Sequence, residues 1–560
     1  FLTALTPSSL GSGPLIFNGG AFRIDSSTGV DPSAFTLVST NSKPVQLLTD
    51  GADFTLGHAL TGFTSGLTKS GLGALILKQD NAYTGTTAVV LGDLILDYSE
   101  AGGQKTPADG TITLGNNARL ILRNGQAATP DQAVRTLSTY KGANARVIHD
   151  SAMPLAFNFL SPHSDSVLNL EGEGPYKVIQ TSNGSENSAY PNILPANILF
   201  KGRDWAVRTA SGNAISNFTD YASDWSGSNK HVDVTAGLAQ SVPANLEVAT
   251  LRFNTPNNGN PIILNLSGTN QIKSGAILVT EAMGNTPVHI TGGAIARMGS
   301  GNLIIYNFNT QAVVRIDSQL LGFPVFNTND LGQVTGITLS DVGVMKAGPG
   351  KVILGNADNR HDDYTSVLEG ELEISGPECL GVGSWHGSWK SVQNFVMIYN
   401  GGTLTTTGSF DFAREVYPGC TNITTFDINS AGGVLNVSGA GDRVANLDAN
   451  PTPVLRNGGR LVKRGAGTWF VGRGFGSGAD RAEDTVTARE YTMFFDVEEG
   501  SIEHRAGTTS ANSFLGEGSM SMTVRNNAVL KGGGFLYGNN GGGNGGGNPE
   551  DVAIRKVLHI

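Results

Sequence analysis

The chain has little charge and few cysteines. Asp, Glu, Lys and Arg make up 15% of its 560 residues, whereas an ordinary soluble domain has about 25%. The formal net charge is −10, and no basic cluster stands out, so we expect no nucleic-acid partner. No apolar run reaches the ~18 residues of a membrane-spanning helix, so we expect no membrane span in this segment. Sustained helical periodicity is also hard to find, which argues against a helical fold.

The cysteine count restricts the redox chemistry. Two cysteines are too few for a disulfide framework. Cys379 and Cys420 could form one bridge if the protein faces an oxidising exterior, or they could remain two separate thiols. Residue 1 is Phe rather than Met, so we expect a processed N-terminus or a fragment.

The usual signatures of cofactor and metal sites are missing as well. The glycine-rich turns precede strands and contain no phosphate-binding loop motif. Histidine and cysteine nowhere assume zinc spacing, and no Gly-x-Ser-x-Gly elbow supports a serine hydrolase. We therefore expect no cofactor, no metal and no enzymatic activity.

What the chain does have is glycine and short apolar triplets. It contains 76 glycines, about twice the usual share. Short apolar triplets alternate with turns rich in Gly, Asn, Asp and Ser, which is typical of many short strands. We therefore predict an all-β fold.

One pattern recurs four times and carries most of the information. In each copy a basic residue lies two positions before a Gly-x-Gly, and a strand follows. Period two puts Leu75 and Leu77 on one face of that strand, the glycines permit a sharp turn, and we expect the basic side chain to stay in water. The copies are Lys69, Gly71 and Gly73; Arg297, Gly299 and Gly301; Lys346, Gly348 and Gly350; and Lys463, Gly465 and Gly467.

Three copies continue in register but with loops of different length. A Tyr-Thr pair follows the first strand at Tyr83, Tyr364 and Tyr491, at increasing distances from the Gly-x-Gly. Fixed strands with variable loops at one recurring position predict a β-solenoid. A sandwich or a propeller needs more regular strand spacing.

The residues around the first copy resemble a known family. The segments 66–77, 81–87 and 92–96 are similar to the autotransporter-associated β-strand repeat. This resemblance implies a right-handed parallel β-helix with loop insertions, secretion across the outer membrane of a Gram-negative bacterium, and a surface role. It implies no catalytic residue.

The repeats divide the chain into four parts. Residues 1–126 are expected to form β-helix coils with the first clear repeat, and 127–245 irregular coils or a loop-rich elaboration. Residues 246–536 are expected to resume the coils with three further repeats. Residues 537–560 contain a Gly/Asn-rich linker and a terminal strand that could pair with its own solenoid or with a neighbouring molecule.

Two loop regions contain candidate ligands, each with a plainer interpretation. Grouped carboxylates could bind Ca²⁺ or act as the acid/base pair of a glycoside hydrolase, but most such residues are solvated loop residues. Paired tryptophans could stack on a sugar ring, although they more often fill the small core of their own loop. The acidic residues are Asp358, Asp362 and Asp363 beside His361, and Asp480, Glu483 and Asp484; the aromatic candidates are Trp385 and Trp389 beside His386.

Three functions compete on this basis. The leading prediction is an extracellular or cell-surface structural protein, a rod or fibre that forms homo-oligomers or polymers through its solenoid ends or terminal strands. The alternative is an adhesin or carbohydrate-binding passenger whose loops contact a glycan or another cell-surface ligand. A polysaccharide lyase or hydrolase comes third, because it needs carboxylates and bases that converge on one groove.

Overall fold

The structure is a computed structural model. It describes residues 2–3, 6, 10–24, 30–49, 51–181, 193–209, 213–298, 301–328, 334–340, 342–361, 363–381, 385–386, 391–392, 396–411, 416–419, 433–437, 443–446, 459–466, 468–471, 492–504, 519–531 and 557–559. Strands account for 46% of the chain, and the described residues contain short 3₁₀ turns such as η2 (Pro32–Ala34) and η5 (Pro377–Leu380) but no α-helix. The predicted all-β class is confirmed. Within this described part, no helix has the length and hydrophobicity needed to cross a membrane.

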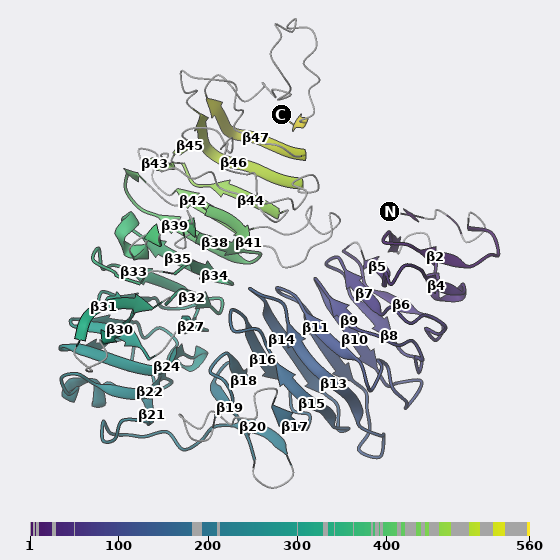
Figure 1. Cartoon of the computed structure of the whole chain (residues 1–560), viewed down its shortest axis with the longest axis horizontal. Coiled ribbons are helices and arrows are strands. Elements are labelled where there is room, and N and C mark those ends of the chain that lie inside the picture. Colours follow the sequence, from purple (N-terminus) through teal and green to yellow (C-terminus); the bar gives the residue numbers. More distant parts are fainter. Residues whose placement is uncertain are drawn as a thin grey trace, which may run out of the picture. The chain divides into compact units, whose positions relative to one another are not determined.

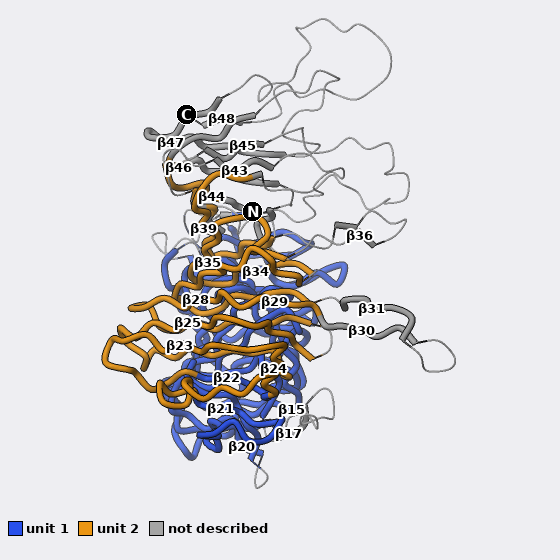
Figure 2. The backbone as a smooth tube through the Cα atoms, turned by 90° about the vertical axis from the view of Figure 1, so that its left-hand side faces the viewer, with its two compact units in different colours: residues 1–233, 248–252, 421–430 blue, residues 234–247, 253–420, 431–560 orange. Residues whose placement is uncertain are grey.

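The chain folds as two compact units (Figure 2). The described part of unit 1 comes from residues 1–233 and 248–252, and that of unit 2 from 234–247, 253–420 and 431–560. Each unit is a set of mostly parallel sheets.

In unit 1 the strands pair in parallel with the strand after next rather than with their neighbour in sequence (Figure 1). Val45 pairs with Leu67, Leu67 with Thr87, and Thr87 with Ile112. We call the stretch of chain from one strand to its parallel partner a coil. A short chain segment between two strands of one coil therefore moves the backbone from one column of strands to the other.

Two columns of strands build unit 1. The first contains β1 (Leu2–Thr3), β3 (Ala21–Ile24), β5 (Val45–Thr49), β7 (Leu67–Ser70), β9 (Thr87–Val89), β11 (Thr111–Leu114), β13 (Gln132–Thr139), β15 (Leu155–Ser161) and β17 (Tyr176–Thr181). The second contains β6 (Phe54–Leu56), β8 (Leu75–Leu77), β10 (Asp93–Asp97), β12 (Arg119–Arg123), β14 (Asn144–Asp150), β16 (Val167–Glu171) and β18 (Ile198–Phe200). A separate pair joins β2 (Leu15–Phe17) to β4 (Leu37–Ser39).

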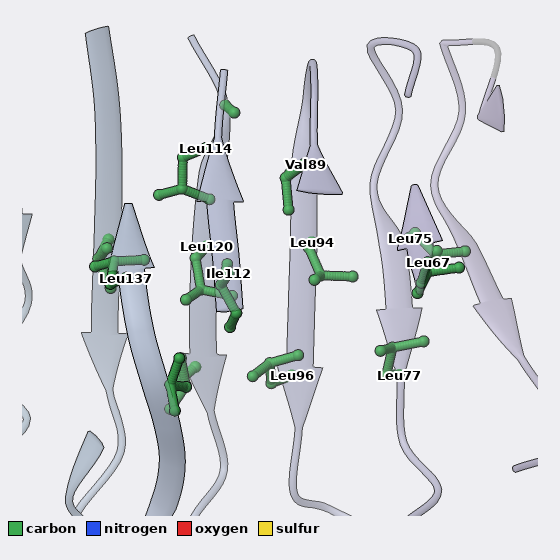
Figure 3. Close-up of a cluster of buried hydrophobic side chains, with 14 of the residues drawn as sticks. Leu67, Leu75, Leu77, Val89, Leu94, Leu96, Ile112, Leu114, Leu120 and Leu137 are labelled. Carbon is green, nitrogen blue, oxygen red and sulfur yellow. The ribbon is translucent and has the colours of Figure 1, made fainter. Parts of the chain in front are cut away.

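The core of unit 1 consists of rows of apolar side chains (Figure 3). Parallel partners are in register, so side chains at paired positions lie on the same side of the sheet. Leu75, Leu94 and Leu120 form one such row and are completely buried. Leu75 and Leu77, predicted to share a face, both belong to this core. Each buried leucine contributes about 1.5–3 kcal/mol, and it gains this only from the coils on either side.

The segment predicted to be irregular, 127–245, is regular in its first part. Strands β13 to β17 continue the parallel pairing. The pattern changes after β18, which pairs antiparallel with β19 (Asp204–Arg208), and β19 pairs antiparallel with β20 (Ala214–Asn217). Beyond them, β21 (His231–Asp233) is parallel to β22 (Glu247–Phe253).

Unit 2 repeats the arrangement of columns. One column contains β24 (Thr269–Val279), β27 (Leu303–Asn307), β32 (Val344–Ala347), β34 (Thr365–Val367), β38 (Val396–Tyr399) and β41 (Val416–Gly419). The other contains β23 (Ile262–Asn265), β25 (Val288–Thr291), β28 (Val314–Ile316), β33 (Lys351–Leu354), β35 (Gly370–Ile374), β39 (Gly402–Thr406), β42 (Gly433–Val437) and β44 (Gly459–Arg464). The first half of β24 also pairs with β26 (Ala294–Arg297), which pairs with β29 (Gln319–Leu321).

The last strands of unit 2 are longer. β46 (Thr492–His504) pairs with β44, with β45 (Thr468–Val471) and with β47 (Ser519–Lys531). β45 also pairs with β43 (Arg443–Asn446), and β43 with β40 (Phe410–Asp411). The terminal β48 (Val557–His559) pairs in parallel with β47 of its own chain. The expected Gly/Asn-rich linker lies outside the described residues.

The described part of unit 2 contains two inserted antiparallel hairpins. One joins β30 (Phe323–Thr328) to β31 (Val334–Ser340), and the other joins β36 (Trp385–His386) to β37 (Ser391–Val392). Each hairpin is inserted between two consecutive strands of the parallel columns. The coils therefore carry added antiparallel structure at these two points.

Candidate functional site

The basic residue of the repeat is buried in the three copies in which it is a lysine, so the prediction that it stays in water is wrong for these copies. Lys69 and Lys346 have no exposed surface, and Lys463 is 2% exposed. Lysine is seldom fully buried unless its charge is paired. Here the amine finds backbone carbonyl oxygens instead of a carboxylate.

Each of these lysines occupies a position that is otherwise apolar. Lys69 lies in register between Leu47 and Val89, both of which belong to the core of unit 1. Lys346 lies between Ile305 and Val367, which are both completely buried. The lysine stem therefore fills a row of core side chains, as the stems of long charged residues often do.

The third lysine follows the same rule. Lys463 lies in register between Leu435 and Val497. Leu435 is buried. All three copies with a lysine thus place it where the neighbouring coils carry aliphatic residues.

The amine of each lysine bonds to carbonyls of two consecutive coils. Lys69 Nζ donates to the carbonyl oxygen of Gly71 in its own coil and, over 2.6 Å, to that of Leu91 in the next. Lys346 Nζ donates to Gly348 and, over 2.7 Å, to Glu369. We call this arrangement a lysine clasp, because one side chain connects backbone groups of adjacent coils.

The third clasp has one more bond. Lys463 Nζ donates to the carbonyl oxygens of Arg464 at 2.8 Å, Gly465 at 2.7 Å and Glu499 at 3.0 Å. The distant acceptor again lies directly before a glycine, Gly500, as Leu91 lies before Gly92 and Glu369 before Gly370. The glycine that opens the second strand of the repeat is therefore part of the clasp.

Two glycines of the first copy show why the clasp requires glycine at these positions. Gly71 has φ +81°, a backbone conformation that other residues rarely adopt. A Cβ on Gly92 would lie 2.4 Å from the Gly71 carbonyl oxygen and 2.6 Å from Lys69 Nζ, closer than van der Waals contact allows. Glycine at this position therefore leaves room for the lysine amine and its acceptor.

Burial also changes the acid-base behaviour of these amines. Desolvation lowers the pKa of Lys346 to about 7, although the nearby Glu369 and Glu371 carboxylates oppose the shift. Desolvation lowers the pKa of Lys463 to about 8, against the opposing charge of Glu499. Removal from water disfavours the charged form of an amine.

The second copy of the pattern is not equivalent to the others. Arg297 ends β26, and the strand after its Gly-x-Gly is β27, which pairs with the lysine-bearing strand β32. In the first and third copies the corresponding strands, β8 and β33, belong to the opposite column from the basic residue. Gly301 is described and has φ +112°, whereas Gly299, like Gly467 of the fourth copy, lies outside the described residues.

A second kind of clasp was missed at the level of sequence. The amide of Asn270 accepts a bond from the Leu246 N–H at 2.9 Å and donates to the Ala294 carbonyl at 3.0 Å, in each case 24 residues away. It is 2% exposed. One side chain therefore joins three consecutive coils.

Asn81 and Asn359 form the same asparagine clasp. Asn81 accepts from the Leu60 N–H at 2.7 Å and donates to the Lys105 carbonyl at 2.9 Å. Asn359 accepts from the Leu320 N–H at 2.8 Å and donates to the Cys379 carbonyl at 2.7 Å. In the first and third copies the asparagine comes shortly before the Tyr-Thr pair, which is the one sequence signal that could have found it.

The described residues of the first acidic cluster make separate contacts. Asp358 is exposed and interacts with Gln319 and Arg360, whereas His361 is completely buried beside Thr365. Asp363 accepts a bond from the Tyr364 N–H. The described residues contain no group of three or more His, Cys, Asp or Glu that could hold a metal ion.

The remaining candidates lie wholly or partly outside the described residues. These are Asp362, Asp480, Glu483, Asp484, Trp389 and Cys420. The backbone of Trp385 and His386 forms β36 of the inserted hairpin. Cys379 is a buried thiol within η5.

A cluster of opposite charges closes the antiparallel end of unit 1. The Arg252 guanidinium bonds to Asp204 and, at 2.7 Å, to Asp233, and it stacks 3.5 Å above the Tyr221 ring. Burial raises the pKa of the Asp204 carboxyl, although the Arg252 charge opposes that shift. Because the four residues are far apart in sequence, no motif could reveal them. Both carboxylates are occupied by the arginine, which suits a structural role.

One histidine is buried in the core without such partners. His149 follows Leu96 and Leu122 in register, is completely buried, and neither ring nitrogen has a hydrogen-bond partner of good geometry. Desolvation lowers the pKa of His149, partly offset by the backbone of Met153 and Pro175. The ring is therefore neutral at neutral pH.

No family model matches the chain, and no curated protein or solved structure matches it either. The resemblance to the autotransporter-associated repeat rests on the repeat residues alone.

Proposed function

We propose that this chain is a structural protein of the cell surface or extracellular space, a β-solenoid that forms rods or fibres. The observation that carries the proposal is the stacking of parallel, in-register coils joined by lysine and asparagine clasps. Such interactions hold successive coils together and present no reactive group to a substrate.

The proposal includes a right-handed parallel β-helix, as the resemblance to the autotransporter-associated repeat implies. Alternating columns of parallel strands, in which Leu67 pairs with Thr87 while Leu75 pairs with Leu94, support a helical path of the chain. The proposal includes a location outside the cell, at the outer surface of a Gram-negative bacterium, because the resemblance implies it. In the described residues, the coils that bury lysines and the inserted hairpins both fit a long scaffold better than an enzyme with a substrate pocket.

Stacked coils can extend from one molecule to the next. Parallel columns have unpaired backbone groups at their ends, which favour pairing with a further strand. A head-to-tail contact of this kind builds open filaments when it does not close. We propose self-assembly into filaments or a sheath on this basis.

Negative-stain electron microscopy of the native protein tests the assembly. We expect ordered filaments that are as wide as a single rod, or sheets made of such filaments. Short, separate monomeric rods over a wide range of concentration would exclude the polymer and leave only a monomeric scaffold.

A second function is favoured by the hairpins of unit 2. The β30–β31 and β36–β37 insertions interrupt the columns without extending them, and binding residues are often carried on loops held by a rigid scaffold. We propose an adhesin or carbohydrate-binding passenger as the alternative, with β36 and its Trp385 in the contact region.

Glycan arrays and cell-binding assays separate the two functions. For an adhesin, deletion of the β36–β37 hairpin should abolish binding, while deletion of the β30–β31 hairpin serves as the matched control. Absence of any glycan or cell binding, or binding that survives both deletions, would reject the adhesin.

A further inference from the structure

The lysine clasps have a direction along the chain. Each amine reaches a carbonyl next to it in its own coil, and a second carbonyl 22 residues later for Lys69, 23 for Lys346 and 36 for Lys463. The second acceptor exists only once the following coil has docked. Until then, the lysine has an open side where that coil will lie.

The solvation and the hydrogen bonds of the amine change when the following coil docks. An undocked lysine is solvated and carries three N–H donors. After docking, Lys346 is completely buried and donates to two carbonyls, Gly348 and Glu369. A neutral amine has two N–H groups, so it satisfies both acceptors without a buried charge.

We propose that Lys346 is a latch that closes when the next coil docks and releases one proton to the solvent as it closes. Docking of this coil therefore becomes tighter as the pH rises. The closed latch consists of a neutral amine between carbonyls of two coils, and the open latch of a solvated ammonium. Lys69 has the same geometry in unit 1.

The charged groups around Lys346 do not replace the proton. Its neighbours in β27 and β34 are Ile305 and Val367. The carboxylates whose charge acts on Lys346 are Glu369 and Glu371, and Glu371 already pairs with Lys351 at 3.0 Å. The Glu369 contact to Lys346 is made by the backbone carbonyl.

The sign of the pH effect follows from proton linkage. With the amine shifted from 10.5 when open to about 7 when closed, the open state binds more protons between these limits. The docked state therefore gains stability as the pH rises through this window, by up to about tenfold in the docking equilibrium per pH unit. Below the lower limit both states are protonated and the effect levels off.

Hydrogen exchange of the intact chain, measured by mass spectrometry, tests the latch. After correction for the intrinsic exchange rate, protection of peptides from β34 and β35 should rise by up to about tenfold per unit between pH 7 and 10. In Lys346→Met, which keeps the apolar stem and removes the amine, this rise should disappear. Protection of β27, which precedes the lysine, should change much less.

Lys351→Met is the matched control. Lys351 also connects to the docking coil, through ion pairs with Glu371 and Glu373, but it lies at the surface. The control should keep the pH-dependent rise in β34 and β35. A rise that persists in Lys346→Met, or an equal loss of protection in β27 and β34, would overturn the proposal.

A measurement on the unaltered protein covers the case in which Lys346→Met does not fold. An amine-acylating reagent should modify Lys346 at least about tenfold more slowly than Lys351, because acylation has to wait for the coil to open. Equal rates at the two lysines would overturn the latch. The result does not depend on polymerisation: monomeric rods in the microscope would reject the filament and leave this test unaffected.

Discussion

Replacement of Asn270 by leucine tests how much one asparagine clasp contributes. The side chain is 2% exposed and joins Leu246 to Ala294 across three coils. Leucine has the same number and branching of side-chain heavy atoms, so its shape is similar while the Leu246 N–H and the Ala294 carbonyl both lose their partner. An unsatisfied buried backbone group costs about 1–3 kcal/mol, and the added apolar surface returns about 1 kcal/mol. With two such groups, we expect a net loss of about 1–5 kcal/mol.

Local hydrogen exchange is the suitable assay, because stacked coils need not unfold in a single step. The Leu246 amide should exchange on the order of a hundredfold faster in Asn270→Leu, since about 1.4 kcal/mol corresponds to tenfold. Asn285→Ala, at an exposed position of the same unit, should leave this rate unchanged. A change of less than about 0.5 kcal/mol at Leu246 would refute the reasoning, since it would mean that the amide finds another partner.

Three further substitutions probe other parts of the fold. Gly92→Ala should destabilise unit 1 by about 1–3 kcal/mol in urea unfolding, because φ is +70° and the new Cβ meets Lys69 Nζ; an unchanged midpoint would contradict the clasp geometry. The free energy of unfolding should fall as the pH falls below about 6.5, because the pKa of His149 is lowered in the folded state, which therefore disfavours the protonated ring. His149→Phe should reduce this dependence on pH. The same dependence in the variant would show that other groups cause it. Arg252→Met should lower stability by about 3 kcal/mol, because Asp204 and Asp233 lose their cation; thermal unfolding of unit 1 checks this, and an unaffected melting temperature would speak against a structural role.

The parts of the fold that were predictable depend on local patterns. Alternation of apolar residues identified Leu75 and Leu77 as one buried face, and both lie in the core. Glycine before a strand identified the turn at Gly71, which has a positive φ. These features need only the residues of one coil, because strand period and turn chemistry are local properties.

The burial of the lysines could not be predicted in the same way. A lysine two positions before a glycine looks like a solvated turn residue, because sequence shows side chains and not backbone acceptors. Its second acceptor is the carbonyl of Leu91 or Glu369, whose position depends on how the next coil packs. The Arg252 cluster is hidden for the same reason, since its two carboxylates, Asp204 and Asp233, come from separate segments.

The second repeat shows a further limit of local patterns. Arg297, Gly301 and Leu303 match the motif in sequence, yet the strand that follows lies in the column of Lys346. A motif determines a turn and a strand. Which column that strand joins is determined by long-range pairing, in this case by β24, which contributes its two halves to two different columns.

The buried polar residues solve a problem of register that the apolar rows create. Leu47, Val89, Ile305 and Val367 are nearly interchangeable in shape, so a coil displaced by one whole repeat would bury almost the same apolar surface. A lysine or an asparagine in such a row is different, because it is satisfied only where carbonyl and N–H groups of the correct coils surround it. A single buried polar residue fixes register in this way in coiled coils, at some cost in stability.

Lys69→Leu should accordingly leave unit 1 folded, with a stability loss smaller than that of Lys69→Ala, but with more than one pairing partner for β7. Cross-linking of cysteine pairs placed at the Thr68–Ala88 register would detect the displaced coil. A single, unchanged cross-link in Lys69→Leu would show that the apolar rows alone select the register.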